Sequence, residues 1–355
     1  MNRATAALFL LLLPLPTTEG AAPAEGRATS RFAISIVQSY GNIPRTISNM
    51  KVWFPIPLDD EGQKILNRVT MAPYNIETAA LSDTGTVIAS MVGGPRGGVP
   101  MQVRLSFDLE RKEDRRGAAM PASPPHTPEV FRALSTRWLM PETLSAIDAP
   151  VKSAARKIVA GRKTPLDKAR AVYDHVVTKM TLLAHPRDLQ GSGYGRVSFT
   201  VKEMKGDRTD MAAAFVGLCR ASGIPARTVT GLRFPADEES GTVRDWHVWA
   251  EFLTEAAGWI PADPSAAMAD PSKKAFYFGS LDADRVTMSI GRDVVLIPAQ
   301  AGPPLNFFVN PYWEGNGREM PPPFIDVSFK RLEQIQNQFI PAAGAAETKP
   351  PGSNR

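Results

Sequence analysis

The spacing of the apolar residues changes along this chain, and that change constrains the fold more than any other feature. From residue 31 to residue 110 apolar and polar side chains alternate, most clearly between Met101 and Leu109. A period of two is typical of strands that are buried on one face. Beyond residue 127 the apolar residues recur every three or four positions, as between Leu166 and Met180, which predicts amphipathic helices. We therefore expect an α+β protein that begins with an antiparallel β-sandwich.

A charged segment that continues into Ala, Pro and Ser residues, 111–127, separates the two patterns. Such a composition is typical of a linker between domains. The 355 residues are enough for two domains and their tails. We therefore predict a sandwich at 31–110, a second domain at 128–315, a C-terminal extension at 316–340 and a polar, disordered tail at 341–355.

The second domain is predicted to begin with helices and to continue into an antiparallel sheet. Thr127 and Thr164 each stand before a proline, and threonine followed by proline is a typical helix start. Two more helices are expected at Ala149–Val159 and at about Thr209–Ala221. The strands expected after them are Arg227–Leu232, Trp246–Leu253, Gly258–Pro261 and Leu305–Tyr312.

Residues 1–24 have the order of a secretory signal peptide. Arg3 supplies a positive charge, an apolar run extends from Ala6 to Leu15, and Ala22-Pro23-Ala24 fits a cleavage site, with Thr18-Glu19-Gly20 as a competitor. The apolar run is too short to span a bilayer. We expect an exported protein, periplasmic or extracellular, with no stable membrane insertion after cleavage; the alternative is an uncleaved apolar helix.

Composition excludes a wholly disordered chain and a collagen-like or coiled-coil rod. Hydrophobic residues make up 43% of the chain and charged residues 22%, which are globular values. The net charge of +5 is spread along the chain and does not indicate nucleic acid as a partner. The single cysteine, Cys219, excludes an intrachain disulfide and a cysteine-based zinc site. The four histidines lack metal-ligand spacing, so no metal and no other cofactor is predicted.

The candidate catalytic and binding residues lie in a few segments of the second domain. Gly206 precedes a predicted helix, so free backbone N–H groups and the positive end of the helix dipole face position 208. His247 lies on a predicted strand, and Asp263 follows on what reads as the next strand of a hairpin. Cross-strand neighbours can hydrogen-bond, so Asp263 can orient the His247 ring. A helix N-terminus that faces a His–Asp pair is the geometry of a cysteine nucleophile site.

These segments resemble the motifs of the transglutaminase-like superfamily of cysteine peptidases and acyltransferases, in its bacterial exported members. In order, the motifs are Gly206-Asp207-Arg208-Thr209-Asp210, Arg220-Ala221-Ser222-Gly223-Ile224-Pro225-Ala226-Arg227, His247-Val248-Trp249-Ala250-Glu251 and Gly258-Trp259-Ile260-Pro261-Ala262-Asp263-Pro264. The resemblance covers the second domain almost from end to end and implies a papain-like α+β fold. It also implies that His247 is a general base and that Asp263 is the third member of a catalytic triad. Trp249 is interpreted as a residue of the core or of the cleft wall and is assigned to ligand binding.

The nucleophilic cysteine of this family falls on Arg208. A guanidinium is permanently protonated and cannot attack a carbonyl carbon. Cys219 lies eleven residues further along the same predicted helix, about 16 Å from its start, and is expected to be a buried structural thiol. The Thr209 side chain points about a hundred degrees away from position 208. Neither is predicted to replace the missing nucleophile.

Three functions follow from these residues. The first is a non-catalytic protein whose cleft binds a peptide or carboxylate-bearing ligand through Arg208, His247 and Trp249. Its partner is then a peptide or protein, including a component of the cell envelope. The second is an active cysteine-peptidase or acyltransferase type of enzyme that acts on peptide or amide substrates with a non-standard nucleophile. The third is an assembly scaffold in the envelope. The missing thiol favours the first.

Overall fold

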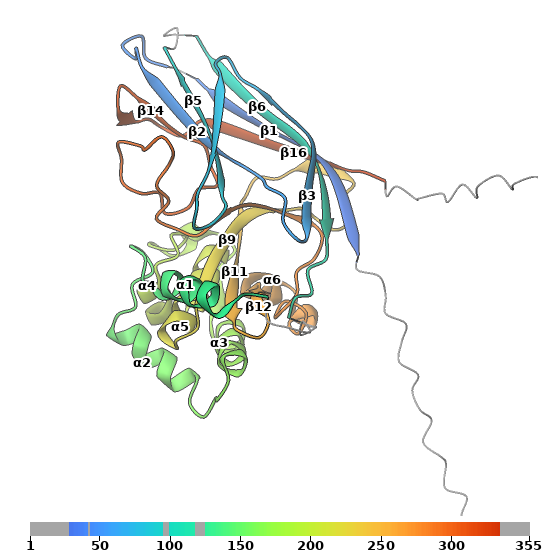
Figure 1. The fold of residues 1–355 in the computed structure, drawn as a ribbon, viewed down its shortest axis with the longest axis vertical. Helices are drawn as coiled ribbons and strands as arrows, with labels where there is room; N and C mark the ends of the chain where they lie inside the picture. Colours follow the sequence, from blue (N-terminus) through green and yellow to red (C-terminus); the bar gives the residue numbers. More distant parts are fainter. Residues whose placement is uncertain (1–27, 42, 95–98, 118–124, 334–355) are drawn as a thin grey trace, which may run out of the picture.

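The computed structural model describes residues 28–41, 43–94, 99–117 and 125–333. The predicted signal peptide, the predicted tail and the middle of the predicted linker lie outside these residues. The described chain forms a two-layered β-sandwich, drawn at the top of Figure 1, and a helix-rich unit below it. The predicted α+β class, with a sandwich at the N-terminal end, is therefore confirmed.

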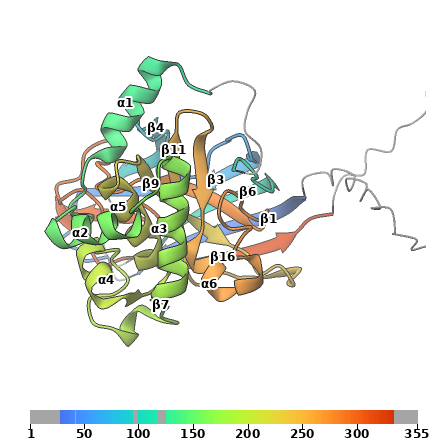
Figure 2. The same cartoon turned by 90° about the horizontal axis from the view of Figure 1, so that it is seen from below.

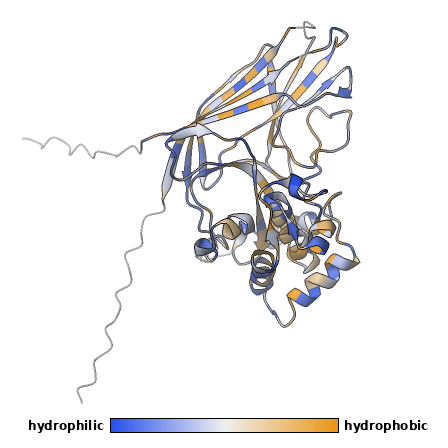
Figure 3. Cartoon of the chain, turned by 180° about the vertical axis from the view of Figure 1, so that it is seen from behind, coloured by the Kyte–Doolittle hydropathy of each residue, from blue (hydrophilic) through white to orange (hydrophobic). Residues whose placement is uncertain are grey.

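The sandwich consists of two five-stranded antiparallel sheets. The first has the order β10-β16-β1-β6-β3, with strands β10 Ser240–Thr242, β16 Phe324–Arg331, β1 Thr29–Tyr40, β6 Met101–Lys112 and β3 Gln63–Met71. The second has the order β15-β14-β2-β5-β4, with strands β15 Arg318–Glu319, β14 Tyr312–Gly315, β2 Met50–Ile56, β5 Val87–Gly93 and β4 Ile76–Ala80. Alternate side chains of both sheets form one core, and the colours along the strands in Figure 3 follow this alternation.

The sandwich uses residues from both ends of the described chain, which the sequence pattern did not predict. The predicted extension, 316–340, contributes β15 and β16, and β16 lies between β10 and β1. The strand predicted at Leu305–Tyr312 is wrong, because that segment makes one isolated bridge and β14 begins at its last residue. Three prolines between residues 303 and 311 lack the N–H group that a strand ladder needs.

The second unit, within the described residues, combines six α-helices with a four-stranded sheet. The helices are α1 Pro128–Leu139, α2 Ala149–Ile158, α3 Pro165–Lys179, α4 Val197–Glu203, α5 Arg208–Ala221 and α6 Pro264–Ala269. The sheet has the order β12-β11-β9-β13, with strands β12 Gly258–Ala262, β11 His247–Thr254, β9 Ala226–Arg233 and β13 Arg285–Ile290. Shorter elements are the parallel strands β7 Thr181–Leu182 and β8 Lys205–Gly206 and the 3-10 turns η1 Pro186–Asp188 and η2 Pro271–Lys273.

The predicted helix starts are confirmed by their capping contacts. The side chain of Thr127 accepts a hydrogen bond from the backbone of Val130 at the start of α1. Thr164 does the same for Asp167 at the start of α3. In both helices proline occupies the first turn. Backbone N–H groups have no intrahelical acceptor there, so the N–H that proline lacks costs no hydrogen bond.

Helix α5 is the central element of the second unit. It contacts the other five helices, and it also covers β9 and β11. Figure 2 shows α2, α3 and α4 around it. Every residue of α5 from Asp210 to Arg220 is buried, so its first turn is held firmly in place. In the part of the chain that the structure covers, no helix has the length and apolar character needed to cross a bilayer.

Polar contacts join the two units. Gln63 of β3 accepts a hydrogen bond from the backbone N–H of Thr287 in β13 at 2.7 Å and donates to its carbonyl at 3.1 Å. Arg116 lies 2.5 Å from the carboxylate of Glu251 in β11, and it also pairs with Asp114 at 2.8 Å. The first two residues of the predicted linker belong to β6 of the sandwich, and the described residues from Asp114 to Gly117 are bound to the second unit.

Candidate functional site

Arg208 is the first residue of α5, where the sequence predicted a helix start, and Asp207 is its N-cap. The Asp207 Oδ1 accepts hydrogen bonds from the backbone N–H groups of Thr209 and Asp210 at 2.9 and 3.1 Å. The backbone N–H of Arg208 has no hydrogen-bond partner in the described part of the chain. One backbone donor is therefore free beside the Arg208 side chain.

A buried carboxylate ties this helix start to the preceding loop. Asp210 accepts hydrogen bonds from Ser192 Oγ at 2.5 Å, from the Gly193 N–H at 2.8 Å, from the Gly195 N–H at 2.9 Å and from the Asp207 N–H at 3.0 Å. Burial and then the charge of Asp210 raise the pKa of Asp207 to about 6. The first turn of α5 is thus fixed by two neighbouring carboxyl groups.

His247 and Asp263 form a buried pair at the start of β11. The His247 Nε2 lies 2.7 Å from the Asp263 Oδ2, and 6% of His247 is exposed. The prediction that Asp263 lies on a strand is wrong. Asp263 follows β12 and is the N-cap of α6. The proline at position 264 explains this difference, because it fits the first turn of a helix and cannot extend the strand ladder.

Burial and the surrounding charges determine the protonation states of His247 and Asp263. Burial raises the pKa of Asp263, but contacts with His247, Arg285 and the Ala266 backbone outweigh burial and hold that pKa well below its ordinary value. Burial lowers the pKa of His247; Asp263 opposes this shift, and the charges of Arg285 and Arg233 add to it. Near pH 7 Asp263 is therefore ionised and His247 neutral. The Nε2–H then donates to Asp263, which leaves a free lone pair on Nδ1.

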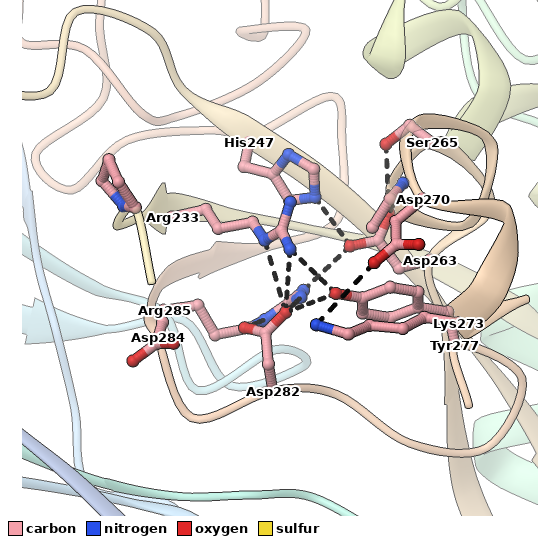
Figure 4. A network of polar contacts seen from close by, with 12 residues as sticks. Arg233, His247, Asp263, Ser265, Asp270, Lys273, Tyr277, Asp282, Asp284 and Arg285 are labelled. Atoms are coloured by element: carbon pink, nitrogen blue, oxygen red, sulfur yellow. Dashed lines mark hydrogen bonds and ion pairs between the residues drawn. The ribbon is translucent and has the colours of Figure 1, made fainter. Parts of the chain in front are cut away.

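A network of arginines and carboxylates extends from Asp263, as Figure 4 shows. The Arg285 Nη1 donates to Asp263 at 3.0 Å, and its Nε and Nη2 donate to Asp282 at 3.1 and 2.9 Å. Asp282 also accepts hydrogen bonds from the Tyr277 hydroxyl at 2.9 Å and from the Arg233 Nη2 at 3.1 Å. The position of Asp263 is therefore set by contacts that reach across three segments of the chain.

Arg208, Arg233 and His247 line one cavity of about 420 Å³. The Arg208 Nη1 donates to the backbone carbonyl of Trp246 at 3.3 Å, and its Nη2 lies 3.6 Å from the exposed carboxylate of Asp245. The Arg208 side chain is 35% exposed. The structure thus places Arg208 and His247 at one cavity, with Asp263 behind His247.

Trp249 lies beside His247 but does not line this cavity. Its ring stacks on the His247 ring, with the centroids 6.2 Å apart, and the Arg285 guanidinium lies 5.2 Å from its ring centroid. The side chain is buried. Trp249 therefore supports the imidazole of His247 and does not line the cavity that Arg208 and His247 share. The ligand contact predicted for Trp249 stays a prediction.

Cys219 and Thr209 also lie away from the cavity lining. Cys219 is fully buried in the helical core, and burial raises the pKa of its thiol. A protonated, buried thiol is unreactive at neutral pH. The structure therefore keeps the chain's thiol apart from the His247–Asp263 pair.

Two arginines of the site, Arg233 and Arg285, were not assigned from the sequence. They lie opposite each other where β9 pairs with β13. Because β13 was not predicted as a strand, nothing in the sequence analysis placed Arg285 near His247. The available signal was the alternation that begins at Arg285 and continues through Val286 and Met288, which is typical of a strand.

Comparison with known sequences defines the class of the second unit. Residues 152–264 match the sequence model of the transglutaminase-like superfamily. The matched region includes Arg208 and His247 and extends one residue beyond Asp263. The chain therefore carries a transglutaminase-like domain, as its four ordered motifs imply.

Similar proteins extend this comparison. A Haemophilus influenzae protein named as uncharacterized is 31% identical over 202 residues, which are 48% of this chain and 54% of the relative, so the chain spans about half of that relative's length. A candidate cysteine protease from Cytophaga hutchinsonii has a TM-score of 0.58 at 18% identity, over 86% of this chain and 92% of that chain. The periplasmic domain of TgpA from Pseudomonas aeruginosa has a TM-score of 0.37 at 15% identity, over 70% of this chain and 91% of that domain. The Cytophaga structure establishes a shared fold and nothing further.

Proposed function

We propose that this is an exported, non-catalytic transglutaminase-like protein whose cleft binds a carboxylate-bearing peptide. The observation that carries the proposal is the charge of the cavity: its lining, among the described residues, contains two arginines and His247 but no Asp or Glu. An anion there meets the Arg208 guanidinium and the free backbone N–H at the start of α5. Export is supported by the signal-peptide order of residues 1–24.

Among the described residues, those that line the cavity offer no good nucleophile. By motif order the nucleophile position falls on Arg208, which cannot attack a carbonyl. Ser265 is the hydroxyl residue of the lining, and its Oγ donates to Asp263 at 3.1 Å. The His247–Asp263 pair keeps the arrangement of a base and its orienting acid without a thiol to activate. This supports binding over acyl transfer.

Protonation of His247 is coupled to the bound carboxylate. A neutral imidazole presents an acceptor at Nδ1, so it cannot donate to an anion. A carboxylate close to Nδ1 raises the pKa of His247 by its charge. The bound state therefore favours a protonated His247 that donates to the ligand, while Asp263 continues to hold the other side of the ring.

The binding test uses the tripeptide Ala-Ala-Gln with a free C-terminal carboxylate and the same peptide with an amidated C-terminus. Calorimetric titration is expected to detect binding of the free acid that is at least about tenfold tighter than binding of the amide, because a charged hydrogen bond contributes about 1.5–3 kcal/mol. Arg208→Met should remove this preference. Arg318→Met is the matched control, because Arg318 is an exposed arginine of β15 outside the cavity. Equal affinity for both peptides contradicts the proposal.

A second test addresses catalysis. The wild-type protein is expected to show no thiol-dependent amidase or acyl-transfer activity. Arg208→Cys places a thiol at a helix N-terminus beside His247, so iodoacetamide should label it much faster than the buried Cys219. His247→Ala in the same background should slow the labelling. Wild-type turnover that is lost in Arg208→Met but kept in Cys219→Ala would instead favour an active enzyme with a non-standard nucleophile.

A further inference from the structure

We infer that the cleft recognises a second carboxylate of its ligand through Arg233, so that the ligand is a peptide ending in an acidic residue. This inference rests on the proposed function, in which Arg208 and the start of α5 bind the first carboxylate. Arg233 is the last residue of β9, it lines the same cavity, and 34% of its side chain is exposed. The cavity therefore presents two guanidinium groups to one ligand.

The Arg233 guanidinium is held in place and still has a free edge. Its Nε and Nη2 donate to Asp282 at 3.3 and 3.1 Å, and Nη2 also donates to the Tyr277 hydroxyl at 2.8 Å. Its Nη1 has no hydrogen-bond partner within the described residues. In Figure 4 the side chain reaches below the His247 ring. A guanidinium that is already ordered loses little further freedom when it binds a carboxylate.

The neighbouring acids do not compete for this free edge. Asp263 accepts four hydrogen bonds, whose donors are His247, Ser265, Arg285 and the backbone of Ala266. Asp282 is occupied by Arg285, Arg233 and Tyr277. Neither carboxylate lines the cavity. Asp245 lies 3.6 Å from the Arg208 Nη2 but is exposed and outside the lining, so the described residues that line the cavity carry positive charge.

The remaining lining suits small apolar groups between two charged ends. It includes Ala184, Pro235, Ala236, Ala266 and Ala269. These walls offer few hydrogen bonds to the body of a peptide, so the arginines supply most of the polar recognition. A C-terminal Glu provides the two carboxylates that such a cavity accepts: its α-carboxylate at Arg208 and its side-chain carboxylate at Arg233.

The experiment compares Ala-Ala-Glu with Ala-Ala-Gln, which have almost the same shape and differ by one negative charge. In calorimetric titrations at pH 7 and low ionic strength, the wild-type protein is expected to bind the Glu peptide about tenfold tighter, as one charged hydrogen bond predicts. Arg233→Met should reduce the affinity ratio to about one. Arg233→Lys keeps the charge and should keep part of the preference, and Arg318→Met should keep all of it.

The outcomes separate this inference from the proposed function. No binding of either peptide by the wild-type protein overturns both. Equal binding of the Glu and Gln peptides, with discrimination against the amidated peptide, overturns the second subsite and leaves the first. A full preference for Glu in Arg233→Met also overturns the inference. Thermal unfolding shows whether Arg233→Met is folded. If it is not, the affinity ratio of Arg233→Lys decides: a reduced ratio supports recognition by the Arg233 guanidinium, and an undiminished ratio overturns it.

Discussion

At the scale of single residues, the charge of His247 decides what the cleft can hold. In the free protein, burial and the charges of Arg285 and Arg233 keep the imidazole neutral, although Asp263 favours the charged form. A neutral ring is the state that a general base requires, and a charged ring is the state that holds an anion. The His247–Asp263 pair is compatible with either role, and the proposed function assigns it the second because Arg208 stands at the nucleophile position.

Carboxylate binding is expected to strengthen as the pH falls from 8 towards 6. The pKa of His247 lies below its ordinary value in the free protein and rises when an anion binds, so the complex holds more protons over this range. By linkage, affinity then increases with falling pH. Titration of Ala-Ala-Gln at several pH values measures this dependence, and His247→Gln should flatten it. An affinity that rises with pH in the wild-type protein contradicts this role of His247.

Asp207, the N-cap of α5, lowers the free energy of unfolding when it is ionised, so its effect depends on pH. The pKa of Asp207 is raised from 3.8 to about 6, so its contribution to stability is full below about pH 4 and is lost as the pH rises through 6. Asparagine keeps the N-cap acceptor without the charge. We expect Asp207→Asn to raise the free energy of unfolding by roughly 1–3 kcal/mol at pH 7.5 and by little at pH 4. Urea unfolding at both pH values tests this, and an equal gain at both contradicts it.

The sequence predicted those site residues that belong to ordered motifs. Arg208, His247 and Asp263 could be placed together because they belong to ordered motifs, although Asp263 is the N-cap of α6 and not a strand residue as expected. Arg233 and Arg285 could not, because they meet through strand pairing between distant segments. A side chain whose role depends on non-local pairing leaves no short motif to detect.

At the scale of elements, α5 depends on close contact with α4. A Cβ added at Gly217 would overlap the side chain of Val197, and both residues are buried. Alanine at an exposed helix position gains about 1 kcal/mol over glycine. Here the overlap with a stiff, β-branched side chain outweighs that gain. Gly217 is therefore a packing requirement of the helix that carries Arg208.

Gly217→Ala is expected to lower the free energy of unfolding by roughly 1–3 kcal/mol. Val197→Ala removes the overlapping methyl groups, so the double variant should lose less than the sum of the two single variants. Denaturant unfolding of all four proteins forms a double-mutant cycle. Strictly additive losses would show that the two side chains do not restrict each other.

Elements were predictable where local signals were strong. Threonine–proline caps predicted α1 and α3, and strict alternation predicted β6. Helix α6 was missed because it has six residues and begins at an Asp-Pro pair that reads as a turn. Strand β16 alternates through Ile325, Val327 and Phe329, but it lies beyond the motifs of the second domain, so the sequence does not assign it to the sandwich.

At the scale of the whole molecule, the sandwich supports one wall of the cavity. Phe234, Pro235 and Ala236 line the cavity. The Phe234 ring packs on Phe329 of β16 with the centroids 5.1 Å apart, and the Arg331 Nη2 donates to the carbonyl of Pro235 at 3.2 Å. The chain returns to the sandwich after completing the second unit, so one strand stabilises both.

Two truncations test this dependence. A chain that ends after Glu319 lacks β16, and a chain that ends after Glu333 keeps it. Strand β16 is eight residues long, pairs with β1 and β10, and leaves Val327 and Phe329 only 4% and 3% exposed. Burial of those two side chains alone contributes roughly 3–6 kcal/mol, which is comparable with the total stability of about 5–15 kcal/mol of a typical domain.

The shorter chain is therefore expected to lose cooperative unfolding and to lose binding of Ala-Ala-Gln. The longer chain should unfold close to the temperature of the whole protein and bind the peptide as tightly, because it retains every strand of the sandwich. Differential scanning calorimetry and peptide titration measure the two properties separately. Cooperative unfolding of the shorter chain with unchanged peptide affinity would show that the second unit holds its cavity without the sandwich. Cooperative unfolding with weakened affinity would instead locate the contribution of β16 at the wall formed by Phe234 and Pro235.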